Sequence, residues 1–261
     1  MAGQSWSTFT DVTTLPVTVD LEGPPSSNSV RTPQIRYSVQ PAQGWKVALS
    51  LEAPKVDATV PDSASSSAAT LEQFQGFGDI AARIRRDASW GHLTVSTIVR
   101  TITLRDRNEE IQLVPGLGLQ VSGTIDVSDE NQLLFQVIGG RAVSRFVGSL
   151  GGKGLDVLLD PVTGTWEAVV SYGGYLTYAH RWLRLAPDVV SNFTVGAMGV
   201  TNQDFQLPDA FNYSFYFSGN AFWRITTGAR LGAELSWGQR VNKNGEAGEA
   251  LRFSFAAYFD F

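Results

Sequence analysis

The side chains that most often carry out catalysis are scarce in this sequence. It has 261 residues and no cysteine, which excludes a thiol nucleophile, a thiolate metal site and a disulfide framework. Its two histidines are His92, at an expected turn, and His180, beside Trp182 on an apolar strand face. No Gly-x-Ser-x-Gly motif accompanies them, although a hydrolase needs a serine or an acid held next to a base. We therefore expect no enzyme, no metal centre and no cofactor.

Two further segments match ligand sites only in part. Gly151-Gly152-Lys153-Gly154 has the glycines and lysine of a phosphate loop, but lacks its spacing and the Ser or Thr after the lysine. A second segment carries oxygen ligands suited to a divalent ion, at Asp106, Asn108, Glu109 and Glu110. Both segments fall between expected strands, so we interpret them as solvated outer loops.

Arginine is the residue type that indicates a function. Sixteen of the 20 cationic residues are arginine, and its planar guanidinium stays charged and binds carboxylates in a bidentate manner. Strand phase puts eight of them on polar faces, and one of the eight is Arg252. The other seven are the candidates that would line a pore and attract small anions: Arg36, Arg83, Arg85, Arg100, Arg181, Arg224 and Arg230. The alternative is that these arginines only pair with acids of the same faces, such as Glu52 and Glu234, and so hold neighbouring strands together.

The elements that position these arginines are predicted to be strands. Apolar residues occupy every second position of Leu251–Phe261, and the same two-residue period recurs along the chain without a convincing helix. The sequence predicts about twelve strands, at Gly3–Phe9, Gln34–Val39, Trp45–Glu52, Asp79–Asp87, Leu93–Arg105, Gly116–Ile125, Gln132–Val137, Trp166–Trp182, Asn192–Val200, Tyr213–Arg224, Arg230–Gln239 and Leu251–Phe261.

The composition of the two strand faces distinguishes a membrane barrel from a soluble sandwich. Apolar faces carry aromatic residues near the strand ends, as in the girdles of outer-membrane barrels: Trp45, Trp166, Trp182, Tyr213, Trp223, Trp237, Phe253 and Phe261. Polar faces combine arginine with glycine, serine and threonine, which leaves room inside. A soluble all-β binding module, in which the aromatic faces meet one another, is the competing fold.

The spacing of the strands supports the barrel. Outer-membrane barrels alternate short periplasmic turns with long outer loops. The expected long loops are Thr10–Thr32, Ala53–Gly78, Asp106–Pro115, Arg145–Thr165, Thr201–Asn212 and Val241–Ala250, and the short turns between them are Gln40–Gly44, Ala88–Gly91, Val127–Asn131, Arg184–Val190 and Thr226–Gly228. We predict an all-β, transmembrane antiparallel β-barrel that forms a single domain over residues 1–261, with both termini at the periplasm.

Charge and hydropathy exclude other classes of protein. The net charge of −5 argues against a protein that coats nucleic acid. No run of 18 apolar residues suggests a transmembrane helix, and the first residues lack the basic and apolar regions of a secretory signal. Either the chain works in the cytoplasm or its leader lies outside this sequence.

Several segments carry a family resemblance. The most specific are Gly3-Gln4-Ser5-Trp6 and Pro33-Gln34-Ile35-Arg36-Tyr37, and further ones are Leu21–Pro24, Trp90–His92 with Arg83, and Tyr172–Trp182. Over these stretches the chain resembles the DcaP-like family of trimeric outer-membrane porins. The resemblance implies a bacterial outer-membrane location, contact with lipid, a homotrimer, and passive uptake of dicarboxylates and related anions.

The sequence departs from that family at its beginning. Family members carry a signal peptide, a helical segment and further strands before the Gly-Gln-Ser-Trp motif, which here begins at Gly3. We therefore expect a fragment, an alternative start or a shortened form of such a porin. Twelve is still an even number of strands, so Gly3–Phe9 and Leu251–Phe261 are permitted to close the barrel.

The first long loop is a candidate for a constriction. Thr10–Thr32 contains few charges, and its apolar residues and prolines, among them Leu15 and Pro16, favour an ordered segment that folds inward, with Glu22 near its tip. The leading hypothesis is a porin that passes small anionic solutes such as dicarboxylates through an arginine-lined pore. The alternative is a non-conducting, shortened or truncated membrane barrel whose lumen is plugged or unclosed.

Overall fold

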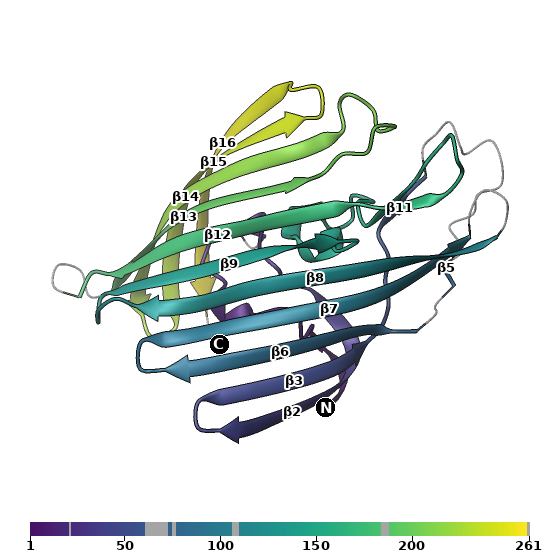
Figure 1. Cartoon of the computed structure of the whole chain (residues 1–261). Coiled ribbons are helices and arrows are strands. Elements are labelled where there is room, and N and C mark those ends of the chain that lie inside the picture. The colour runs from purple at the N-terminus through teal and green to yellow at the C-terminus, as the bar shows by residue number, and fades with distance from the viewer. Residues whose placement is uncertain (21, 61–72, 75–76, 106–109, 184–187, 260–261) are drawn as a thin grey trace.

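The protein is built on one long antiparallel sheet. The computed structural model describes residues 1–20, 22–60, 73–74, 77–105, 110–183 and 188–259. Twelve strands follow one another across the sheet in chain order: β1 (Ala2–Trp6), β2 (Arg31–Ala42), β3 (Trp45–Glu52), β6 (Asp79–Ala88), β7 (Gly91–Arg105), β8 (Ile111–Asp126), β9 (Asn131–Arg141), β12 (Val170–Arg181), β13 (Val189–Val200), β14 (Phe211–Thr226), β15 (Ala229–Asn242) and β16 (Ala247–Phe259). Figure 1 shows this order, which confirms the predicted all-β class.

Most strands of the sheet have an apolar outer face and a mainly polar inner face. In β7, Leu93, Val95 and Val99 point outward and are exposed, whereas the alternating Thr94 and Ser96 are buried. In β16 the outward Phe253 remains 70% exposed. An outer surface of bare aliphatic and aromatic side chains suits contact with lipid and does not suit contact with water.

The connections follow the predicted alternation in part. Short hairpin turns join β2 to β3, β6 to β7, β8 to β9 and β14 to β15 at one end of the sheet, and most connections at the other end are longer (Figure 1). Two expected long loops are wrong. Strands β15 and β16 extend and leave only residues 243–246 of Val241–Ala250 between them, and β8 begins at Ile111, which leaves only residues 106–110 of Asp106–Pro115. Asp106, Asn108, Glu109 and Phe261 lie outside the described residues.

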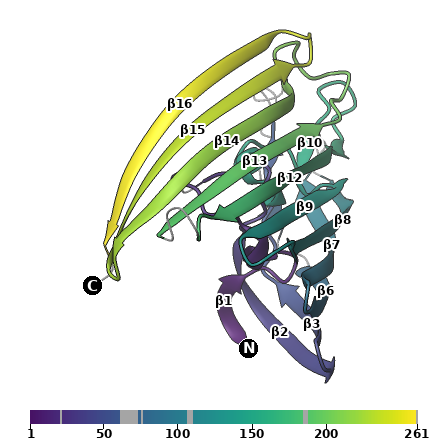
Figure 2. The same ribbon diagram turned by 90° about the vertical axis from the view of Figure 1, so that its left-hand side faces the viewer.

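The sheet curves strongly but does not close in the described part of the chain. Figure 2 shows an open trough with β1 and β16 at its two edges. The pairing of Gly3–Phe9 with Leu251–Phe261, which an even number of strands permits, is not formed between the described residues of β1 and β16. Strand β1 ends at Trp6 because Ser7–Phe9 turn inward, where the Ser7 hydroxyl donates to Glu52 (2.7 Å).

The long connections contain the remaining elements. A small sheet combines β10 (Val157–Leu159), β11 (Trp166–Ala168) and β4 (Ala58–Thr59), and β5 (Gln73–Phe74) pairs with β7. The described helices are single 3-10 turns at η1 (Val12–Thr14), η3 (Ser144–Phe146) and η4 (Gly148–Leu150). None of these helices is long or apolar enough to span a membrane.

The division of Trp166–Trp182 into β11 and β12 corrects the sequence prediction. Trp166 is only 3% exposed, and its indole N–H donates to the carbonyl of Arg105 (2.7 Å). It therefore packs within the small sheet and takes no part in an outer aromatic girdle.

Much of the trough is filled by protein. Phe9 meets Phe146 edge-to-face at 5.3 Å between ring centroids, and both pack with Ile98 and Ile138 of the inner wall. A Cβ atom at Gly118 would lie 3.0 Å from Phe9 and Ile98, tighter than most real contacts. The small residues of the inner face thus allow connecting segments to pack closely against the sheet.

Candidate pore lining and constriction

Residues 7–20 and 22–30, which we call the inner strap, run across the concave face of the sheet. The strap begins at β3, where the buried Glu52 accepts hydrogen bonds from the Ser7 hydroxyl and the Thr8 backbone N–H, both at 2.7 Å. A carboxylate that receives two such bonds holds the chain in one place. The strap therefore leaves the sheet edge along a fixed path.

Asp11 anchors the next part of the strap to β7 and β8. Its Oδ2 lies 3.1 Å from His92 Nε2 and accepts from the Ser122 hydroxyl at 3.0 Å. Burial by itself would raise the pKa of Asp11, but hydrogen bonds from His92 and Thr13 outweigh burial and hold that pKa well below its usual range. The carboxylate is therefore a charged anchor at neutral pH.

The strap then crosses the second half of the sheet. The Tyr175 hydroxyl of β12 donates to the Thr14 carbonyl at 3.0 Å. Asn192 and Asn220 both donate to the Val17 carbonyl, at 3.1 and 3.0 Å. These bonds satisfy the strap's backbone on the inner face of β12, β13 and β14.

The tip of the strap reaches the last two strands before the chain returns. Glu234 of β15 accepts from the Val19 backbone N–H at 3.1 Å, and Arg252 of β16 pairs with Asp20. On the way back, the Ser26 hydroxyl donates to the Gly174 carbonyl at 2.8 Å.

The strap thus follows the inward course expected for Thr10–Thr32. Leu15 is half-buried and Pro16 is buried within it, while Glu22 near its tip is exposed.

Loss of the Asp11 carboxylate is expected to loosen the strap. Asp11→Ala leaves buried donors unpaired, so we expect the free energy of unfolding to fall by about 1–3 kcal/mol. A lowered pKa contributes stability above the ordinary aspartate pKa and loses it as pH falls through the lower folded value. The difference between wild type and variant should therefore be constant from about pH 7 to 5 and shrink below about pH 4.

Urea unfolding in detergent, followed by tryptophan fluorescence, measures this difference. Asp129→Ala in the exposed β8–β9 turn is the control and should change the unfolding free energy little at any pH. An equal loss for both variants would contradict the anchoring role.

Four cations of β2, β3 and β6, called the basic cluster, face one inner cavity of about 360 Å³: Arg36, Lys46, Arg83 and Arg85. The strand register explains why they lie close together. Lys46 of β3 is paired with Arg85 of β6, and Arg83 lies two residues before Arg85 on the same face of β6. Arg85 and Lys46 share Asp87, at 2.7 and 3.0 Å.

Two members of the basic cluster lack a carboxylate partner. Arg83 donates to the Thr10 carbonyl (3.0 Å) and Arg36 to the Trp6 carbonyl (3.4 Å). Within the described part of the chain, neither forms an ion pair. The cluster therefore has an excess of positive charge beside the strap.

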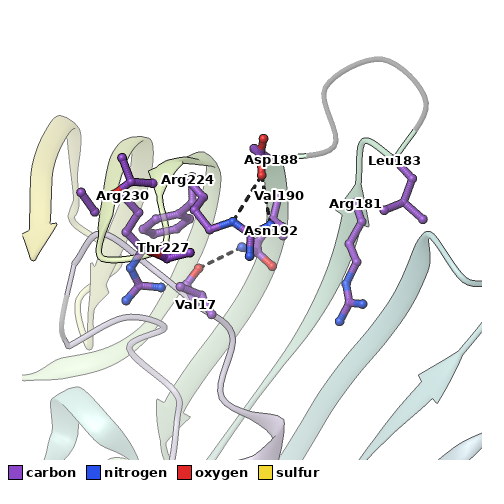
Figure 3. A pocket seen from close by; sticks show the side chains of 12 residues that line it. Val17, Arg181, Leu183, Asp188, Val190, Asn192, Arg224, Thr227 and Arg230 are labelled. Atoms are coloured by element: carbon purple, nitrogen blue, oxygen red, sulfur yellow. Dashed lines mark hydrogen bonds and ion pairs between the residues drawn. The ribbon is translucent and has the colours of Figure 1, made fainter. Parts of the chain in front are cut away.

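A second cavity of about 440 Å³, called the turn-end pocket, lies between the strap and the turn ends of β12–β15 (Figure 3). Arg181, Arg224 and Arg230 line it. Arg224 pairs with Asp188 at 3.0 Å, and the Arg230 guanidinium lies over the rings of Phe222 and Tyr258. Six of the seven predicted arginines thus line one of the two cavities.

Arg100 is the exception among the predicted arginines. It is 1% exposed, lies beneath the long connections, and forms ion pairs with Asp79 (3.1 Å) and Asp156 (2.8 Å). It therefore links the sheet to the connection between β9 and β12 and does not reach either cavity. Arg100 therefore fits the alternative interpretation of the inward arginines, in which they pair with acids and hold neighbouring segments together.

Removing this buried charge is expected to cost much stability. Arg100→Met removes the ion-pair partner of the buried Asp156 and leaves Asp79 with only the more distant Arg145 at 3.9 Å, so the free energy of unfolding should fall by about 3–5 kcal/mol. Arg224→Met removes an exposed pair and should cost no more than about 1 kcal/mol. Urea unfolding of both variants in detergent measures the contrast, and similar losses would refute the structural assignment of Arg100.

Several inward polar residues were not singled out from the sequence. Tyr175, Asn192 and Asn220 hold the strap, and Gln120 accepts from Asn28 at 2.8 Å. Their strand phase was available as a signal, because each stands on a polar face. Their partners were not, since the contacts join residues 92 to 203 positions apart.

Two other parts of the chain that were singled out from the sequence, His180 and Gly151–Gly154, can be located in the structure. His180 stacks edge-on against Trp182 on the outer face at 4.7 Å, as its strand phase indicated. Gly151–Gly154 lies in the connection between β9 and β10 and has no strand-to-helix context. Among the described residues, no group of three or more potential metal ligands occurs.

Comparisons of structure identify similar proteins where comparisons of sequence do not. No protein-family model matches the chain, and no curated protein matches it. The structure of the outer membrane channel DcaP of Acinetobacter baumannii is similar at 17% identity and a TM-score of 0.84, over 100% of this chain and 71% of that one.

Two porins are more distant. An anion-selective porin from Comamonas acidovorans is similar at 6% identity and a TM-score of 0.56, over 87% of this chain and 60% of that one. A porin refined at 1.8 Å is similar at 12% identity and a TM-score of 0.52, over 95% of this chain and 66% of that one. The strand order and these similarities lead to one conclusion: the chain has the fold of the outer membrane channel DcaP and of other porins.

Proposed function

We propose that this protein is a bacterial outer-membrane channel for the passive diffusion of small anionic solutes, dicarboxylates among them. The observation that carries the proposal is the basic cluster, in which Arg36 and Arg83 face an inner cavity without an ion-pair partner among the described residues. A positive excess in a narrow, low-dielectric lumen attracts anions even when the whole protein has a net charge of −5.

The inner strap supports the same proposal. It crosses the concave face from β3 to β16 and occupies space that an unobstructed barrel would leave to water. A segment fixed in this position narrows the passage and brings a solute close to the arginines. Leu15, Pro16 and Glu22 belong to the strap and are the proposed constriction residues.

Reversal potentials test the proposal. The refolded chain is inserted into planar lipid bilayers under a KCl gradient, and the sign of the potential gives the preferred ion. We expect anion preference, and a lower chloride current in the presence of succinate as the dianion competes for the lumen. Cation preference would overturn the proposal.

A non-conducting barrel is the second candidate, and one observation favours it. The described edges β1 and β16 are not paired with each other. An open edge exposes unpaired backbone groups, which the hydrocarbon core of a membrane does not tolerate. Folded, membrane-inserted protein without any conductance would support this candidate.

The oligomeric state is part of the proposal. A homotrimer would bury part of the apolar outer surface between subunits, and outer-membrane lipid would cover the rest. Chemical cross-linking in lipid vesicles, followed by electrophoresis, should give a trimer band, and a monomer alone would contradict this arrangement.

A further inference from the structure

The turn-end pocket differs in chemistry from the basic cluster. Its cations come from β12, β14 and β15, on the opposite half of the sheet, and apolar side chains lie among them. Val17 of the strap is 47% exposed and Leu183 is 46% exposed, although both border a cavity lined by arginines. An exposed apolar side chain beside a cation suits a solute that has both an anionic group and an apolar part.

The position of Val17 is fixed by its own backbone. Asn192 and Asn220 donate to its carbonyl, and Glu234 accepts from the N–H of nearby Val19. These hydrogen bonds hold the backbone of Val17 and Val19 against the inner face of the sheet, and the isopropyl group of Val17 borders the cavity. Val17 thus provides a fixed apolar surface.

The charges of the pocket are only partly neutralised. Asp188 pairs with Arg224, whereas Arg181 and Arg230 form no ion pair with any residue that the structure describes. Arg230 lies 5.6 Å from the centroid of the Phe222 ring and 4.6 Å from that of Tyr258. A guanidinium held over two rings keeps its N–H edge available for a carboxylate.

We infer that the turn-end pocket is a binding site for a monocarboxylate with a ring or a short hydrocarbon chain. The carboxylate pairs with Arg230, and the hydrocarbon part packs on Val17. Arg181 approaches from the opposite side of the pocket and adds a longer-range attraction (Figure 3). The cavity of about 440 Å³ is of the size of small-molecule sites, which are about 300–1,000 Å³.

The inference rests on the proposed function in one respect, because a solute must be able to enter the lumen. Binding itself needs neither conduction nor selectivity. It can therefore be measured on the folded chain in detergent, by isothermal titration with benzoate and with acetate as the two probes.

The expected result is a preference for benzoate over acetate of about tenfold, because the ring removes apolar surface from water. Arg230→Gln should weaken benzoate binding about tenfold, and Arg181→Gln only about twofold to threefold, because attraction weakens with distance. Val17→Ser should abolish the preference and leave acetate binding unchanged. Arg240→Gln is the matched control, because Arg240 is an exposed arginine of β15 that lines neither cavity, and it should not affect benzoate binding.

Three results would overturn the site. These are equal binding of the two probes, no measurable benzoate binding, or equal losses from Arg240→Gln and Arg230→Gln. Reversal potentials on the same preparations separate this inference from the proposed function. Anion preference without benzoate binding would refute only the site, and benzoate binding with cation preference would refute only the selectivity.

Discussion

Replacing Arg83 and Arg85 together with alanine is expected to reduce the preference for anions severalfold. The two guanidiniums lie on one face of β6 and border the same cavity as Arg36 and Lys46. At ~7 Å and an effective dielectric constant of about 20, one unit charge changes the energy of a passing ion by ~2 kcal/mol before screening by salt. The substitution also removes the partner that Arg85 provides for Asp87 and Asp11.

The measurement is the reversal potential in a KCl gradient, with lysine replacements as the control. Arg83→Lys with Arg85→Lys keeps both charges while it alters the geometry of the donors, so chloride preference should persist. Competition by a dianion such as succinate should still weaken in the lysine variant, because lysine lacks the planar fork that binds carboxylates. Unchanged selectivity in the alanine variant would mean that these arginines serve only to connect the strands and the strap.

Shortening the tip of the strap is expected to raise single-channel conductance severalfold. Thr14 and Ser26 bond to the adjacent residues Tyr175 and Gly174 of β12, so the chain leaves and returns at nearly the same place. Residues 16–24 can therefore be replaced by two glycines without separating the strap from its earlier anchors. The loss exposes Asn192, Asn220 and Glu234, which are polar and tolerate water.

Two controls accompany this variant. Val17→Ala keeps the full length of the strap and should leave conductance close to wild type. The heat-modifiable electrophoretic mobility of each variant reports whether the barrel has folded. A folded, shortened variant with unchanged conductance would show that the tip lies away from the narrowest part of the channel.

Two features of the fold follow from local patterns, which the sequence displays directly. The two-residue period predicts strands because successive side chains point to opposite faces, and all twelve predicted strands have counterparts in the sheet. The alternation of short and long connections orients the strands because a short turn can join only antiparallel neighbours. Strand phase likewise assigned Arg36, Arg83 and Arg85 to the inner face, where the structure has them.

Which segments fill the space inside the sheet depends on the tertiary structure. The abundance of small inward residues indicated open space, yet Gly118 and Gly173 are small because Phe9, Val143 and Val147 pack directly on them. Phase gave Arg100 the same inward direction as Arg83, but only Arg100 lies under the connection that carries Asp156. A local period fixes the direction of a side chain and contains nothing about which distant segment covers it.

Closure of the sheet and the charge balance of the lumen also depend on contacts between residues that lie far apart in the sequence. The even strand count permits pairing of the first and last strands, but Ser7 and Thr8 bond to Glu52 and draw the chain inward after Trp6. Which arginines remain free of acids depends on contacts such as Arg224 with Asp188 and Arg252 with Asp20. The strands and their two faces can be predicted from the sequence, because they depend on neighbouring residues. The tertiary structure decided which inward charges are neutralised, because that depends on residues up to 232 positions apart.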